Sequence, residues 1–176
     1  FMKIVSLAAQ YKASMIVSTY NEPLITSEWA VAVFREAQSQ GFKTGYVSNG
    51  HATENVLDYL VPWINFYKVD LKSFNDKHYR ELGGHLDAVL KSIRMIYERK
   101  IWLEVVTLCI PGFNDSEDEL GKIAAFLASV SPDIPWHVTA FHQEYKMRDK
   151  DNTSAQILLK AAQIGQEAGL HYVYAG

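Results

Sequence analysis

The chain has 176 residues, enough for one domain with a sizeable core. Hydrophobic residues make up 48% and charged residues 21%, which is ordinary for a globular protein. The net charge is −3 and no basic cluster occurs, so we expect no nucleic-acid partner. No apolar run approaches the ~20 residues of a membrane span, so we expect no membrane partner either.

Helical and strand patterns alternate along the whole chain. Strands are expected over 14–19, 44–48, 64–71, 101–110, 135–141 and 171–175. Helices are expected over 3–11, 27–40, 53–60, 76–82, 86–99, 117–130 and 153–169. Near-continuous apolar strands between amphipathic helices predict an α/β fold with a parallel sheet buried on both faces. A doubly wound sheet and a barrel of βα units would both produce this pattern.

Helix ends carry recognisable capping residues. Thr53, a residue near Asn75, and Ser116 are predicted N-caps. Glu119, at the third position of its helix, is predicted to complete a capping box with Ser116. Thr153 is expected to open the last long helix, which ends at a glycine.

The only cysteine is Cys109. One thiol excludes an intramolecular disulfide and any multi-thiolate metal site, and its apolar strand pattern indicates a buried, inert group. A single free thiol fits a reducing cytoplasm, and the start Phe1-Met2-Lys3 has no signal-peptide pattern. The scattered histidines lack the spacing of metal ligands, so no metal site is predicted.

Polar residues follow the first two strands, where parallel α/β folds place their sites. Tyr20-Asn21-Glu22-Pro23 ends the first strand, and Pro23 restricts Glu22 to an extended conformation. The Glu22 carboxylate can then accept hydrogen bonds from an ammonium group, with helix capping as the alternative. Ser48-Asn49-Gly50 ends the second strand, and a plain turn is its alternative role.

The third strand ends in Asp70-Leu71-Lys72. Two-residue periodicity places Asp70 and Lys72 on one face of the strand. Opposite charges on a buried face are costly to desolvate unless something compensates them. A zwitterion such as an amino acid would do so, and a mutual salt bridge is the alternative.

The last strands also carry polar residues. Glu104 stands in an apolar strand, so it either points into a polar interior or lies near the wet end. Pro111-Gly112 is interpreted as a structural turn. His137 is interpreted as a packing residue, whereas His142 at the strand end is a candidate site residue.

Together these motifs resemble one known family. They are Tyr20-Asn21-Glu22-Pro23, Ser48-Asn49-Gly50, Val69-Asp70-Leu71-Lys72-Ser73-Phe74, Ile110-Pro111-Gly112-Phe113-Asn114-Asp115, Trp136-His137-Val138-Thr139-Ala140-Phe141-His142 and Tyr145-Lys146-Met147. The series is similar to the radical S-adenosylmethionine (SAM) member of the AmmeMemoRadiSam system, a group similar to the activating enzyme of pyruvate formate-lyase. The resemblance covers about 3–176.

The resemblance implies a partial (β/α) barrel, an incomplete TIM-like barrel with about six parallel strands and outer helices. In such enzymes a first strand ends in a Cys-x-x-x-Cys-x-x-Cys loop that binds a 4Fe–4S cluster, and the cluster binds SAM. Reductive cleavage of SAM gives a 5′-deoxyadenosyl radical, which abstracts hydrogen from a substrate.

The resemblance also implies a set of SAM-binding residues. Glu22 would hold the SAM ammonium group, Asp70 and Lys72 would lie near the methionine part, and Lys72 would meet the carboxylate. Ser48 and Asn49 would form the rim, His142 would lie near the adenosyl group, and Asn21 would stand beside Glu22. We expect Glu22, Asp70 and Lys72 to converge at one mouth of a curved sheet.

The sequence departs from the family where the cluster would bind. The Cys motif and its strand are absent, so we expect 1–176 to be a single domain, the C-terminal part of a radical SAM core. By itself it would be inactive, with no catalytic residue and no metal ligand. Val47 and Val106 replace an aspartate and an arginine of the activating enzyme. The strand at 14–19 would have an unpaired edge that self-associates or is covered by the first helix.

Two other interpretations stay open. The chain could be a non-catalytic scaffold that binds a partner protein. It could also be a SAM-independent α/β hydrolase or lyase that uses Glu22, Asp70, Lys72 and His142. The substrate, a small molecule or a protein, is not indicated by the sequence.

Overall fold

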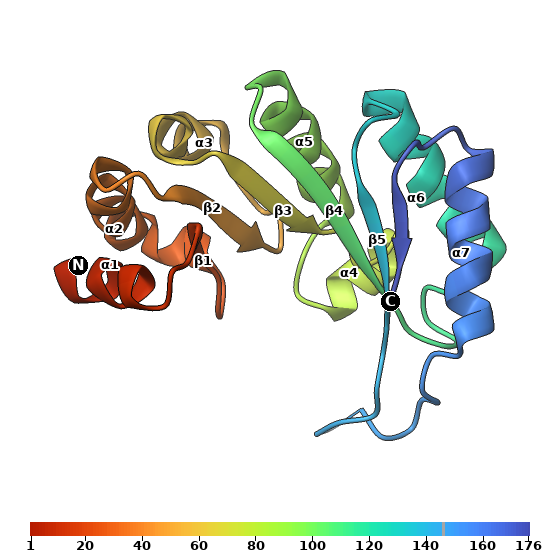
Figure 1. Cartoon of the computed structure of the whole chain (residues 1–176). Coiled ribbons are helices and arrows are strands. Elements are labelled where there is room, and N and C mark those ends of the chain that lie inside the picture. Colours follow the sequence, from red (N-terminus) through yellow and green to blue (C-terminus); the bar gives the residue numbers. More distant parts are fainter. Residues whose placement is uncertain (146) are drawn as a thin grey trace. The chain divides into compact units, whose positions relative to one another are not determined.

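The computed structural model describes residues 1–145 and 147–176 (Figure 1). Lys146, part of one motif quoted above, lies outside the described residues. The strands are β1 (Met15–Ser18), β2 (Lys43–Ser48), β3 (Phe66–Asp70), β4 (Trp102–Cys109), β5 (Trp136–Ala140) and β6 (Val173–Ala175). The α-helices are α1 (Met2–Gln10), α2 (Ser27–Ser39), α3 (Glu54–Leu60), α4 (Asp76–Glu81), α5 (Leu86–Glu98), α6 (Glu117–Val130) and α7 (Ala155–Glu167). Two short 3-10 helices are η1 (Pro23–Thr26) and η2 (Val61–Trp63).

The sheet has six strands in the order β1-β2-β3-β4-β5-β6. The pairs β1–β2, β2–β3, β4–β5 and β5–β6 are parallel. A strand order that follows the chain order is what successive βα units give, because each parallel connection needs a crossover. The predicted α/β class with six parallel strands is therefore confirmed. None of the helices within the described residues is long and apolar enough to cross a bilayer.

The chain divides into two compact units. The first unit contains Phe1–Val69 and Ala88–Leu103, and the second contains Asp70–Asp87 and Glu104–Gly176. Each unit is described by itself below. The prediction that 1–176 folds as a single domain stays a prediction.

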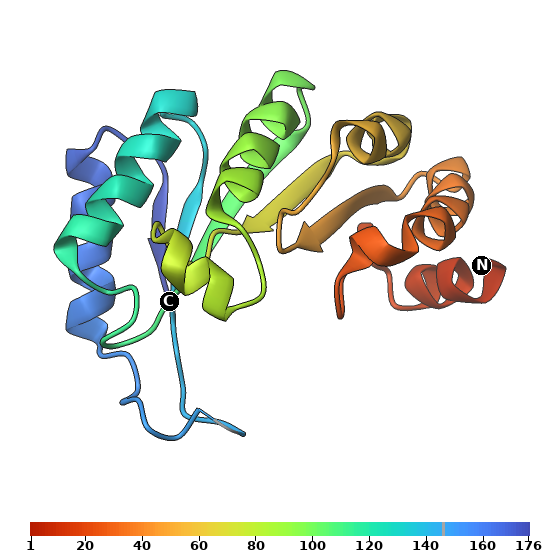
Figure 2. The same cartoon turned by 180° about the vertical axis from the view of Figure 1, so that it is seen from behind.

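In the first unit, α2, α3 and α5 lie on the same face of strands β1 to β3 (Figures 1 and 2). Tyr46 of β2 and Tyr67 of β3 point to this face and stack, with ring centroids 5.6 Å apart. Phe34 of α2 meets the edge of Tyr46 at 5.8 Å. From α5, the fully buried Ile93 and Ile96 belong to the apolar face that periodicity predicts.

In the second unit, α6 and α7 pack together, and α7 lies against β5 and β6 (Figure 2). The fully buried Trp136 is among the largest core side chains, and its Nε1–H donates to Thr107 Oγ1 at 3.0 Å. That hydroxyl donates in turn to the carbonyl of Leu71 at 2.9 Å. On β4, buried residues alternate with exposed ones such as Leu108, so the predicted burial of both sheet faces is wrong.

Most predicted caps are confirmed. Side-chain oxygens of Thr53, Asn75 and Ser116 accept the backbone N–H groups of Val56, Lys77 and Glu119, respectively. The cap of α7 is Ser154, one residue later than predicted. Thr153 is buried instead, where its hydroxyl accepts from the Phe141 N–H at 2.9 Å. The predicted role of Glu119 in a capping box is wrong, because its carboxylate accepts from the Phe74 N–H at 2.9 Å.

Close packing of α7 depends on Gly165. A Cβ atom there would lie 2.9 Å from Val173 Cγ2 and 3.0 Å from Trp136 Cε3. We expect Gly165→Ala to lower the free energy of unfolding by about 1–3 kcal/mol through overpacking. The matched control is Gly121→Ala on α6, where a Cβ would meet nothing within 4 Å. That change should stabilise by up to ~1 kcal/mol through helix propensity. Urea denaturation of both variants checks the difference, and equal effects would contradict it.

The edge of β1 is the predicted place of self-association. Within the described residues, β1 pairs only with β2, and the Met15 side chain is 47% exposed. We expect the 176-residue chain to associate with rising concentration and Met15→Lys to weaken this, because an edge lysine opposes strand pairing. Leu159→Lys, at an exposed position of α7, is the control. Sedimentation equilibrium measures the association of the 176-residue chain and of the two variants. A chain that stays monomeric at high concentration would favour coverage of the edge by α1, which contacts β1.

Candidate functional site

In the first unit, the carboxylate of Glu22 joins two strand-end loops. Glu22 is extended, with φ −133° and ψ 108°, as the following proline requires. Its Oε1 accepts from the Leu24 N–H at 3.1 Å, which makes Glu22 the N-cap of η1. The same carboxylate accepts from Ser48 Oγ at 2.8 Å and from the Asn49 N–H at 2.7 Å. The capping role and the contact with the second strand end therefore both occur.

The loop after β2 is a turn that presents these donors. Ser48 Oγ accepts from the Gly50 N–H at 3.1 Å, and Asn49 Oδ1 accepts from the His51 N–H at 3.0 Å. Gly50 has φ +78°, and a Cβ there would lie 2.7 Å from Val69 Cγ1. Glycine is thus required by both conformation and space. The turn fixes the Ser48 hydroxyl and the Asn49 amide toward Glu22.

The charge of Glu22 has no cationic partner among residues 1–145 and 147–176. Within the described part of the chain, none of the ion pairs involves this carboxylate. Three hydrogen bonds occupy three of its roughly four acceptor positions. Burial raises the pKa of the Tyr67 hydroxyl, and the negative charge of Glu22 adds to this rise. A half-buried carboxylate with an open acceptor position is suited to an ammonium group. The neighbouring Asn21 is exposed and makes no hydrogen bond to any described residue.

In the second unit, Asp70 and Lys72 pair with each other. Lys72 Nζ lies 3.0 Å from Asp70 Oδ2, and the two side chains are 42% and 33% exposed, respectively. They share a face, as the two-residue spacing predicts, but the premise that this face is buried is wrong. A half-exposed pair is worth at most about 1 kcal/mol, so it needs no zwitterion to compensate it. The structure has the mutual salt bridge, and the binding role stays a prediction.

The backbone around Lys72 is firmly held. The Leu71 N–H donates to the Val106 carbonyl at 2.9 Å, and the Lys72 N–H donates to the Tyr79 hydroxyl at 3.0 Å. Burial raises the pKa of Tyr79 to about 12, so its hydroxyl stays neutral. The chain leaving β3 thus keeps its backbone donors satisfied while the Lys72 side chain reaches solvent.

Asn114 is the main anchor of this segment, and it is 1% exposed. Its Nδ2 donates to the carbonyls of Lys72 at 2.7 Å and Leu108 at 2.8 Å. Its Oδ1 accepts from the Ile110 N–H at 2.7 Å. The predicted structural turn after β4 therefore has a specific purpose, which is to place one amide between two strand ends.

Glu119 anchors the next two residues. Its Oε1 accepts from the Ser73 hydroxyl and from the Phe74 N–H, and its Oε2 lies 3.9 Å from His78 Nδ1. The His78 ring stacks on Phe113 at 4.3 Å between centroids. Ser73 is fully buried, so this arrangement is a structural clamp rather than a nucleophile.

The remaining predicted positions lie apart from these anchors. His142 follows β5, is exposed, and makes no hydrogen bond or ion pair to any described residue. His137 is more than the predicted packing residue, because its Nε2 lies 2.9 Å from Glu104 Oε2. Glu22 belongs to the first unit, whereas Asp70, Lys72 and His142 belong to the second. Their convergence stays a prediction.

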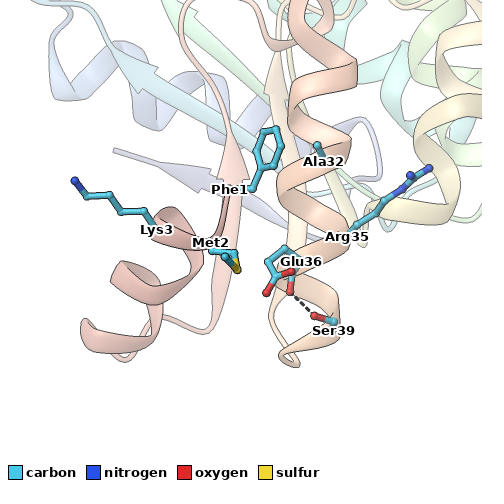
Figure 3. A pocket seen from close by; sticks show the side chains of 7 residues that line it. All are labelled: Phe1, Met2, Lys3, Ala32, Arg35, Glu36 and Ser39. Atoms are coloured by element: carbon cyan, nitrogen blue, oxygen red, sulfur yellow. Dashed lines mark hydrogen bonds between the residues drawn. The ribbon is translucent and has the colours of Figure 1, made fainter.

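No predicted site residue lines the pocket between α1 and α2. This pocket has a volume of about 490 Å³, and Figure 3 shows the side chain of Lys3 pointing away from the other labelled residues. Its lining comprises Phe1, Met2, Lys3, Ala32, Arg35, Glu36 and Ser39. The pocket therefore shares no residue with the predicted SAM-binding set.

The described residues do not fit an iron–sulfur cluster. They contain no group of three or more His, Cys, Asp or Glu side chains placed to hold a metal. Burial raises the pKa of the Cys109 thiol to about 12, so the thiolate is disfavoured.

Loss of the Asn114 amide should be costly. Asn114→Ala removes the side-chain partner of three partly buried backbone groups, so we expect a loss of about 2–4 kcal/mol in unfolding free energy. Faster amide exchange around Lys72 and Ile110 should accompany it. Asn21→Ala, at an exposed asparagine, is the matched control and should change stability by less than about 0.5 kcal/mol. Denaturation and hydrogen exchange measure both, and a small effect at Asn114 would show that the anchor is dispensable.

Several proteins from other organisms are similar in sequence. No protein-family model matches the chain. An uncharacterized protein of Methanocaldococcus jannaschii, MJ0808, is 29% identical over 175 residues, which is 99% of this chain and 52% of that protein. The isethionate sulfite-lyase activating enzyme of Oleidesulfovibrio alaskensis is 27% identical over 78% of this chain and 46% of its own length. The pyruvate formate-lyase-activating enzyme of Staphylococcus epidermidis is 26% identical over 69% of this chain and 51% of its own length. The chain thus spans about half the length of these relatives.

Solved structures share the fold. A domain of the pyruvate formate-lyase-activating enzyme from Bacteroides vulgatus superimposes with a TM-score of 0.82 at 21% identity, over 93% of this chain and 99% of that domain. A radical SAM methyltransferase from Sphaerobacter thermophilus gives a TM-score of 0.75 at 16% identity, over 98% of this chain and 55% of the methyltransferase chain. The partial TIM-like class of the fold is confirmed by these neighbours. The chain is therefore homologous to the radical SAM activating enzymes, the group that includes the pyruvate formate-lyase activating enzyme.

Proposed function

We propose that this chain is the SAM-binding part of a radical SAM enzyme of the activating type. The observation that carries the proposal is the Glu22 carboxylate, which is fixed by three hydrogen bonds and has no cationic partner within the described residues. The homologues and the fold support the same class. The cluster-binding cysteines would be supplied outside these 176 residues, since the relatives are about twice as long.

The residues present suit the charged end of SAM. Glu22 offers its open acceptor position to the ammonium group, while Ser48 and Asn49 hold the carboxylate in place. Lys72 can leave Asp70 at little cost, because their pair is half exposed, and then meet the SAM carboxylate. When bound, SAM supplies by reductive cleavage the radical that abstracts hydrogen from a substrate.

The cluster itself does not fit this chain. One buried thiol cannot replace three thiolates, so we propose that the 176-residue chain alone is inactive. The free thiol suits a reducing cytoplasm as the place of action. The substrate, a small molecule or a protein, is not assigned.

The gene provides the first test. The reading frame upstream of Phe1 is expected to encode a Cys-x-x-x-Cys-x-x-Cys motif. The protein so encoded, reconstituted with iron and sulfide and then reduced, should convert SAM to 5′-deoxyadenosine. The 176-residue chain treated in the same way should show neither cluster absorbance nor this product. Stoichiometric cluster binding by the chain alone would contradict the proposal, and so would turnover of a substrate without iron or SAM.

Two variants of the cluster-containing protein test the assigned residues. Glu22→Gln and Lys72→Met should each weaken SAM binding about tenfold or more, because each removes a charged hydrogen bond. Lys72→Met should change stability by less than about 1 kcal/mol, as expected for a half-exposed pair. Glu28→Gln and Lys91→Met, at exposed positions, are matched controls. Equilibrium dialysis with SAM measures affinity, and unchanged affinity in both test variants would refute the assignment.

A further inference from the structure

A second cluster of polar side chains lies on the face of the second unit that the helices leave open. Glu104 is on β4, His137 on β5 and Tyr174 on β6, three neighbouring strands. His137 stands in register with Tyr174 on one side and with Val106 on the other. The cluster alternates with residues such as Trp136, which is fully buried against the helices. None of its residues is among those assigned to SAM.

The imidazole of His137 is held in one orientation. Its Nε2 lies 2.9 Å from Glu104 Oε2, and its ring stacks on Tyr174 with centroids 5.1 Å apart and planes 23° apart. An ionised carboxylate only accepts, so Nε2 donates its proton to Glu104. In the neutral ring this leaves the unshared pair on Nδ1, which makes no hydrogen bond to any described residue. The pair is also only partly exposed, 26% for His137 and 32% for Glu104.

Another acid–histidine pair in the same unit shows the difference. His171 Nδ1 lies 2.8 Å from Asp133 Oδ1, but those side chains are 60% and 69% exposed, as in an ordinary surface pair. The Glu104–His137 pair is instead partly withdrawn from water and braced by an aromatic ring. Val106 and Leu108 lie on the same face of β4 as Glu104, so apolar side chains border the polar cluster.

The chemistry of the cluster selects its ligand. The Glu104 carboxylate gives it a negative charge, and the Nδ1 atom of His137 accepts a hydrogen bond. Tyr174, 52% exposed, offers a ring face that favours a cation. A ligand must therefore donate hydrogen bonds, carry positive charge and have an apolar body. A primary ammonium on an aliphatic or aromatic group meets all three conditions, whereas a carboxylate meets only the last.

We propose that Glu104, His137 and Tyr174 form a binding site for a primary amine with an apolar body. His137 accepts from the ammonium group through Nδ1, Glu104 balances the charge, and Tyr174 packs against the organic part. All three residues belong to the second unit and none is assigned to SAM, so amine binding is tested on the 176-residue chain without SAM.

The test is a titration of the isotopically labelled 176-residue chain followed by NMR. Phenethylamine is the probe, 2-phenylethanol tests the need for charge, and phenylacetate reverses the charge. Saturable shifts at the His137 ring nitrogens and at Tyr174 are expected with phenethylamine, with a dissociation constant of order 1 mM. The alcohol should bind about tenfold more weakly, and the carboxylate should not saturate. Absence of saturation by the amine, or equal binding of phenylacetate, overturns the proposal.

Variants separate recognition from packing. Glu104→Gln keeps the shape and removes the charge, so amine affinity should fall at least fivefold while alcohol affinity stays unchanged. Tyr174→Leu provides a second variant at a more exposed position, and it should also weaken the amine. His171→Phe disrupts the surface pair and should leave binding unchanged. Unchanged amine affinity in Glu104→Gln, or in Tyr174→Leu if Glu104→Gln does not fold, refutes the site. SAM affinity of the cluster-containing protein is measured in parallel and should not respond to Glu104→Gln.

Discussion

The backbone that leaves β3 depends on two buried side chains, Asn114 and Glu119. A chain that leaves a sheet loses its ladder partners, and buried N–H and C=O groups without partners are costly. Asn114 supplies a donor to the Lys72 carbonyl, and Glu119 supplies an acceptor to the Phe74 N–H. Both anchors come from the turn after β4 and the helix after it. These two hydrogen bonds fix the backbone of the segment, while the charged side chain of Lys72 faces solvent.

The first unit also satisfies its loop backbone with a carboxylate. After β1 and β2 the free N–H groups of Leu24 and Asn49 are satisfied by the carboxylate of Glu22. A neutral amide has only one acceptor oxygen, so it could not replace both carboxylate oxygens of Glu22 that accept from Leu24, Ser48 and Asn49. No cation among the described residues balances this charge, so the carboxylate can accept a hydrogen bond from a cationic ligand. The Glu119 carboxylate of the second unit has the His78 imidazole 3.9 Å away, whereas Glu22 has no cationic partner among the described residues, and this is the physical basis for assigning a ligand to Glu22.

Local sequence patterns predicted the fold and part of the site. Apolar periodicity predicted the strands of the sheet and the α-helices between them. Ser116 and Thr53 cap their helices as their positions in the sequence indicate. Glu22 was found because Pro23 restricts it. The anchors were missed because their partners are distant in the chain, 42 residues for Asn114 and Lys72 and 45 for Glu119 and Phe74. A capping box and a buried clamp use the same glutamate position, and only tertiary packing decides between them.

Three carboxylates on the strands and at their ends differ in how their charge is balanced. Asp70 is paired with Lys72, Glu104 is paired with an imidazole, and Glu22 is bonded only to neutral donors. Lys72 balances the charge of Asp70, and because the pair is half exposed, breaking it costs little. The His137 ring contacts Glu104 through Nε2, and its Nδ1 makes no hydrogen bond to any described residue. The sequence shows three acidic residues of the same kind, and the side chains around them give each a different electrostatic task.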